Sequence, residues 1–198
     1  LMQGLADGYF VLPYTIGDYL SNDISTGEIK TDSSEFEKSE RDIRQQLERL
    51  INNKGKHSVD YYHKKLGKIM WNKCGMSRNE KDLKEAIKEI QLLREDFHKN
   101  VNVTGRIGEY NEHLAKATRV SDFLELGELF AKDALERTES CGGHFREEYQ
   151  TKEGDAIRDD KNFKFVSAWE FKGDPSKATL HKEQLKYEDI EVKTRSYK

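Results

Sequence analysis

Cysteine is scarce in this chain, with only Cys74 and Cys141 among 198 residues. The two lie far apart and give no disulfide framework, so a reducing compartment is expected. Apolar residues are also few: hydrophobic types make up 35% of the chain and charged types 36%, with a mean hydropathy of -0.92. This polar composition fits elongated helices with wide solvated faces better than a free-standing enzyme.

An excess of charge of one sign is missing as well. The formal net charge is -3, so no basic field attracts nucleic acid, and we expect no nucleic-acid partner. Residues 1–20 lack the basic start and small-residue cleavage site of a signal peptide. Gln3, Asp7 and Asp18 interrupt their apolar run, which is already too short for a membrane span. We expect no direct membrane insertion.

Motifs that carry chemistry are absent from the sequence. It contains no phosphate-binding glycine fingerprint, no nucleophile elbow, no paired metal ligands and no carboxylate pair in an identifiable cleft. Cys141 and His144 have a C-x-x-H spacing, but neither a second ligand pair nor a third orienting group accompanies them. We therefore expect no catalytic residue and no metal site.

Helical periodicity dominates residues 35–140, which we assign to one helical domain after a polar linker at 21–34. Ser34–Glu37 and Ser77–Glu80 have the pattern of capping boxes and predict helix starts. The strongest apolar stripe follows the second box, at Leu83, Ala86, Ile87, Ile90, Leu93 and Phe97. Single stripes and short connectors predict a mainly α fold, an antiparallel three-helix (spectrin-like) bundle with one longer helix.

The C-terminal part, residues 141–198, is predicted to be a loop followed by a β-hairpin and an extended tail. Phe163–Phe171 is rich in aromatic residues and roughly alternates, Gly173–Pro175 has turn composition, and Thr179–Leu185 returns as the partner strand. Because an isolated two-stranded hairpin is marginally stable, we expect it to lie on the bundle or on a domain absent from this chain.

The stretch from Arg137 to Tyr149 is the most informative in the chain. A helix-periodic run leads into Glu-Ser-Cys-Gly-Gly-His-Phe-Arg at residues 139–146. We expect Gly142 and Gly143 to stop the helix and to let the backbone pass close to another surface, because glycine adopts angles that side chains forbid. Polar side chains beside such a turn commonly position a group or join two domains.

This string resembles the Glu-Ser-Arg/Cys-Gly-Gly/Ala-His-Phe/Tyr-Arg signature near the C-terminus of the flavoprotein subunit of succinate dehydrogenase and fumarate reductase. The resemblance runs essentially end to end and is nearest to the Bacteroidetes-type form. It includes further segments at Leu1–Leu20, Leu66–Trp71, Ala86–Ile90, Leu93–Arg94 and Asp122–Leu126. Cys141 departs from the arginine usual in many relatives, so no ion pair is assigned to it.

The resemblance implies that residues 1–20 are the last helix of a truncated FAD-binding domain, and that the chain is a C-terminal fragment. The whole subunit would carry FAD and interconvert succinate and fumarate. It would work with an iron–sulfur subunit and a membrane-anchor subunit, in the cytoplasm and peripheral to the inner membrane. The family's catalytic, substrate-binding and flavin-linking residues lie upstream of the segment matching Leu1. Only the backbone amide of Leu1 matches a flavin-contacting position. We therefore expect this fragment to bind no cofactor and to be inactive in isolation.

Two interpretations are open for Arg137, Ser140, His144 and Arg146, the residues that match the signature. They could pin this domain against the flavin domain or the iron–sulfur subunit through charge-assisted hydrogen bonds. Alternatively, they cap the last helix and tie down the tail, since helix ends need such partners. For the chain as a whole, the alternatives are a stand-alone helical-bundle interaction module and a fragment of an L-aspartate oxidase-like flavoenzyme.

Overall fold

The computed structural model of the chain describes residues 2–193, in two compact units that divide between Gln45 and Gln46. The first unit holds a continuous helical segment, made of α1 (Met2–Ala6), the π-helical turn η1 (Asp7–Val11) and α2 (Leu12–Leu20). A stretch without helix or strand follows, and then the greater part of α3 (Ser34–Asn52). Leu1, the predicted flavin-contacting position, lies outside the described residues.

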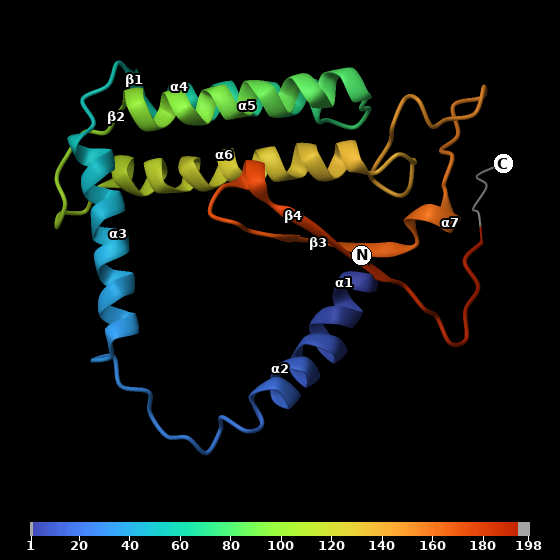
Figure 1. Ribbon diagram of the computed structural model, residues 1–198, viewed down its shortest axis with the longest axis horizontal. Coiled ribbons are helices and arrows are strands. Elements are labelled where there is room, and N and C mark those ends of the chain that lie inside the picture. The colour runs from blue at the N-terminus through green and yellow to red at the C-terminus, as the bar shows by residue number, and fades with distance from the viewer. Residues whose placement is uncertain (1, 194–198) are drawn as a thin grey trace. The chain divides into compact units, whose positions relative to one another are not determined.

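The second unit is built on three helices that run side by side, α4 (Val59–Lys73), α5 (Glu80–Asn100) and α6 (Glu112–Glu136) (Figure 1). Their apolar stripes meet in one core, and the last turns of α3 add Leu47, Leu50 and Ile51 to it. The fully buried members of this core are Tyr62, Ile90, Phe97, Val101, Ala117 and Leu124. The predicted mainly helical bundle with a C-terminal hairpin is confirmed.

A two-residue parallel strand pair, which the sequence did not predict, joins the two connectors at one end of the bundle. β1 (His57–Ser58) pairs with β2 (Val101–Asn102). The backbone at Gly55 passes so close to α5 that a Cβ there would lie 1.9 Å from the carbonyl oxygen of Asn100. No side chain fits in that space, so this glycine is required for the close approach of the connector.

The predicted capping box at Ser77–Glu80 is wrong. α5 begins at Glu80, and its cap is Asn79, whose side chain accepts a hydrogen bond from the backbone N–H of Asp82. The Ser77 hydroxyl instead donates to Glu147 in the tail. The physical reason is a backbone bridge to the tail: the Arg78 N–H donates to the carbonyl of Phe145, and the Arg78 carbonyl accepts from the N–H of Glu147. Because the backbone of Arg78 is engaged in this bridge, the helix starts after it.

The hairpin is confirmed and lies on the bundle. β3 (Phe165–Glu170) and β4 (Thr179–Gln184) are antiparallel, with Phe165 opposite Gln184 and Glu170 opposite Thr179. A short helix, α7 (Asp160–Phe163), precedes them, and the 3-10 turn η2 (Pro175–Lys177) lies between them. The Trp169 indole N–H donates to Asp133 of α6 at 2.8 Å, and Lys132 donates to the carbonyl of Pro175 at 2.7 Å. These bonds supply the support that an isolated hairpin lacks.

No helix within residues 2–193 combines the length and the apolar character that crossing a membrane requires.

Candidate functional site

The signature residues surround the C-terminal end of α6. The helix ends at Glu136, six positions before Gly142, so Gly142 and Gly143 do not stop it. They form instead the centre of a tight turn in which Cys141 and His144 exchange backbone hydrogen bonds of 2.8 and 3.0 Å. Gly142 has φ +59, and a Cβ on either glycine would meet nothing within 4 Å. The expected close approach to another surface is therefore absent within the described residues.

Arg146 caps the helix with its side chain. Its Nη1 donates to the carbonyls of Ala134 and Leu135 at 3.0 and 3.2 Å, and more weakly to that of Arg137 at 3.4 Å. The residue is only 1% exposed. The last carbonyls of an α-helix lack intrahelical partners and carry the negative end of the helix dipole, so a buried cation suits this place. Its Nε also pairs with Glu148 at 3.1 Å.

Ser140 and Glu139 hold the chain in position around this guanidinium. The Ser140 hydroxyl accepts from the Arg146 N–H at 2.8 Å and donates to the Arg146 carbonyl at 3.2 Å. Glu139 is buried and accepts from Arg137 and from the backbone N–H of Asp159. Every buried side-chain nitrogen and oxygen in residues 2–193 has a partner. Each buried polar side-chain atom at this junction, the region around the C-terminal end of α6, therefore has at least one partner.

His144 is held in one tautomer. Because a carbonyl only accepts, Nε2 donates to the carbonyl of Arg137 at 2.9 Å, and Nδ1 then accepts from Nη1 of Arg78 at 2.9 Å. Burial lowers the pKa of His144, the bond to the Arg137 carbonyl opposes that shift, and the nearby arginines lower the pKa further. With both ring nitrogens engaged, the imidazole offers no free base to Cys141. No group of three His, Cys, Asp or Glu side chains in residues 2–193 could hold a metal ion.

Arg78 is the functional candidate that the sequence did not reveal. Its guanidinium lies 4.9 Å from the ring centre of Phe130 and donates to the carbonyl of Gly75 and to His144. It lines a pocket of about 350 Å³ with Phe130, Asp133, Arg137, Cys141 and His144. Burial lowers the pKa of Arg78, and no carboxylate in residues 2–193 offsets that effect. No local pattern marks this residue, because the tail brings His144 beside it from far along the chain.

The four predicted residues thus meet at one junction, and each makes contacts within this domain. Arg137 bonds Glu139 and the Phe163 carbonyl, and the other three bond backbone groups near the end of α6. These contacts fit the capping interpretation. A further role for the same residues at a domain or subunit interface remains a prediction.

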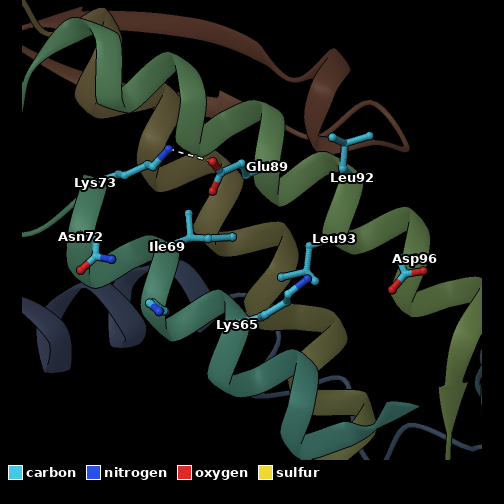
Figure 2. A pocket seen from close by; sticks show the side chains of 9 residues that line it. Lys65, Ile69, Asn72, Lys73, Glu89, Leu92, Leu93 and Asp96 are labelled. Carbon is cyan, nitrogen blue, oxygen red and sulfur yellow. Dashed lines mark hydrogen bonds and ion pairs between the residues drawn. The ribbon is translucent and has the colours of Figure 1, made fainter. Parts of the chain in front are cut away.

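A groove of about 520 Å³ lies elsewhere, between α4 and α5 (Figure 2). Ile69, Leu92 and Leu93 give it an apolar lining. Lys73 spans it and bonds Glu85 and Glu89 at 2.8 Å each, which raises the pKa of the lysine. The ammonium group of Lys73 thus joins α4 to α5 through two carboxylates of α5. This pairing activates no acid, base or nucleophile.

Comparison with known proteins places this geometry in a family. The model of the family described as fumarate reductase flavoprotein C-term matches residues 63–197. The fumarate reductase flavoprotein subunit of Helicobacter pylori strain J99 is 29% identical over 179 residues, 89% of this chain and 23% of that subunit. The Proteus vulgaris subunit is 30% identical over 131 residues, 66% of this chain and 21% of that subunit.

Solved structures give the same fold. A variant of Escherichia coli quinol fumarate reductase FrdA superposes with a TM-score of 0.72 at 23% identity, over 86% of this chain and 28% of that chain. A chain of the Mycobacterium smegmatis Sdh1 complex in the apo form superposes with a TM-score of 0.59 at 26% identity, over 74% of this chain and 24% of that chain. This chain therefore spans about a quarter of the length of the relatives it matches.

Proposed function

This chain belongs to the fumarate reductase flavoprotein C-terminal family, and we propose that it scaffolds a subunit that interconverts succinate and fumarate. In this proposal the flavin chemistry belongs to the remainder of the subunit. The helical domain supplies a rigid body, and its α6 junction faces a neighbouring domain or subunit. The match of the family model over residues 63–197 carries the proposal.

The chemistry of the described residues supports a scaffold. The fully buried charges are paired with one another or with backbone groups, an arrangement that stabilises a fold. His144 has no free nitrogen, and no cluster in residues 2–193 could hold a metal. A catalytic site needs a base or nucleophile within reach of substrate, and the imidazole at the junction has both nitrogens engaged.

The proposal includes a cofactor and partners for the complete subunit. FAD would be held by the part of the subunit that this chain does not span, with the backbone amide of Leu1 approaching the flavin. An iron–sulfur subunit would accept the electrons, and a membrane-anchor subunit would hold the complex at the inner membrane, on its cytoplasmic side. Arg137, Ser140, His144 and Arg146 would stiffen the surface that meets these neighbours.

Flavin content and turnover test the proposal directly. The complete subunit and this chain alone are purified, and each is assayed for flavin absorbance and for succinate-dependent reduction of a dye. We expect flavin and turnover from the complete subunit, and neither from this chain even with FAD added. Flavin bound to the chain alone contradicts the scaffold role. A parent reading frame without a dinucleotide-type glycine pattern favours the stand-alone interaction module instead.

A further inference from the structure

An incompletely bonded cation lies at one end of α6. Two of the five N–H groups of Arg78 are used, one by the Gly75 carbonyl and one by His144. Asp133 lines the same pocket, but it accepts from the Trp169 indole and makes no ion pair with Arg78. Half-buried guanidinium groups are ordinarily paired, because desolvation of the charge costs free energy that a carboxylate offsets.

An apolar strip leads along α6 to this cation. Phe123, Leu126 and Phe130 point outward on one face of the helix, with exposed fractions of 42%, 61% and 46%. Together with Gly67 and Met70 of α4 they line a shallow hollow of about 280 Å³. We call these three α6 residues the uncovered strip. Phe130 belongs to the hollow and also to the Arg78 pocket, so the two features are continuous.

We propose that Arg78 and the uncovered strip form one docking face for the flavin-binding part of the same subunit. That part would lay apolar side chains on the strip and place a carboxylate against the free N–H groups of Arg78. The proposal rests on the proposed function, since it names the partner that the scaffold meets. It assigns the contact to Arg78 and α6, in addition to the signature residues of the tail.

Charge and chain length favour this occupant. A carboxylate can accept two parallel N–H bonds from a guanidinium, and the pocket beside Arg78 has room for one. An apolar centre with a charged residue at one end is the usual make-up of a stable interface. In the relatives, about three quarters of the length lies outside the matched part, so in a complete subunit of that kind a large body would be available to cover the face.

Thiol labelling of the complete subunit tests whether the strip is covered. Leu126→Cys places a thiol on the strip, and Lys88→Cys places one on an exposed position of α5 as the matched control. Labelling is followed peptide by peptide with mass spectrometry. We expect the Leu126→Cys thiol to react at least about ten times more slowly than the control, because reaction needs local opening of the interface. Equal rates overturn the proposal.

Arg78→Met then tests the charged end of the face. Placed in the Leu126→Cys subunit, it should raise the labelling rate about ten-fold, because an interfacial carboxylate loses its partner. Arg106→Met removes an exposed arginine and should leave the rate unchanged. Arg78→Lys keeps the charge and should have a smaller effect than Arg78→Met. An unchanged rate in the Arg78→Met subunit overturns the ion pair, and far-UV circular dichroism checks that each variant is folded.

Three other outcomes identify a different occupant and also overturn the proposal. Protection that appears only after the iron–sulfur subunit is added assigns the face to that partner. Stabilisation by inorganic phosphate that disappears in Arg78→Met indicates a small-anion site. Protection that depends on protein concentration indicates a second copy. Flavin content and succinate oxidation are measured in the same samples. If the subunit is active but the Leu126→Cys thiol reacts as fast as the control, the docking face is refuted and the proposed function stands. If the subunit holds no flavin, both the docking face and the proposed function are refuted.

Discussion

The two sides of α6 differ in how completely they are satisfied. On the side that faces α5, Glu128 pairs with Arg94 at 2.7 Å, and at the end of the helix Arg146 caps the last carbonyls. On the face that carries the uncovered strip, the chain's own tail supplies contacts only at the C-terminal end, where Asp133 holds Trp169 and His144 contacts Arg78. Arg78 has no carboxylate partner among residues 2–193. The domain thus satisfies one side of its longest helix from within, and most of the uncovered strip stays partly exposed in the described residues. Substitutions on the two sides should differ accordingly.

Arg146→Met should give the largest loss of stability. The buried guanidinium holds the final carbonyls of α6 and pairs with Glu148, so its removal leaves helix-end acceptors buried without donors. We expect the free energy of unfolding of this chain to fall by about 3 kcal/mol. Urea denaturation monitored by circular dichroism measures it, with Arg106→Met as the control. A loss below about 1 kcal/mol would mean that water replaces the cap freely.

Arg94→Met should lower the free energy of unfolding by less, about 2 kcal/mol. The buried Glu128 keeps a hydrogen bond with Gln91 and an ion pair with Lys132. The cost arises from the carboxylate left behind, so replacing it as well should recover part of the loss. A double-mutant cycle with Glu128→Met measures the coupling. If the losses of the two single variants add up to the loss of the double variant, the ion pair contributes nothing specific on this side of α6.

The pH dependence of stability tests the junction around His144. Burial lowers its pKa in the folded chain below the ordinary 6.5, so the unfolded chain binds more protons as the pH falls through that value. The stability contribution is complete above about pH 6.5 and is lost as the pH falls toward the folded pKa. Between about pH 7.5 and 5.5, the free energy of unfolding should fall less in His144→Gln than in the parent. The difference between the two proteins should be under about 1 kcal/mol, because the ring is half-buried.

The control for that experiment is His98, whose pKa burial also lowers. Its contribution has the same sign and persists in His144→Gln, so only the difference between the two proteins reports on the junction. Identical pH profiles would show that burial and the neighbouring arginine charges do not hold the imidazole neutral.

Leu126→Gln should have the smallest effect on stability. We expect it to change the free energy of unfolding of this chain by no more than about 0.5 kcal/mol, because the side chain is already 61% exposed. The same substitution in the complete subunit should cost more if the strip is covered there. Thermal unfolding of both proteins measures the contrast. A large loss in this chain alone would mean that the two sides of α6 are equally packed.

The helices and the hairpin could be predicted because their signals are local. Leu83, Ile90 and Phe97 recur on one face of a helix, and all are buried in α5. The alternation around Trp169 and the turn at Pro175 predicted strands that pair in register. The errors occurred where a distant segment intervened: the start of α5 moved because residues 145–147 pair with the backbone of Arg78.

The candidate site was predictable only in part. The signature drew attention to Ser140, His144 and Arg146, which do meet at one junction. The partner Arg78 was not predicted, and neither was Glu128, which is fully buried. A carboxylate within the apolar stripe of α6 was the available signal, since such a residue is buried only with a cation beside it.

By itself, the sequence determined where helices and strands form and which stripe of each faces a core, because backbone geometry converts residue spacing directly into a face. The tertiary structure alone decided which charges are neutralised and which remain exposed to a partner. Glu128 meets Arg94 and Arg146 meets the end of α6 only after the chain has folded back on itself. Coulombic and hydrogen-bond energies depend on distances of a few ångströms in space, and separation along the chain does not specify them.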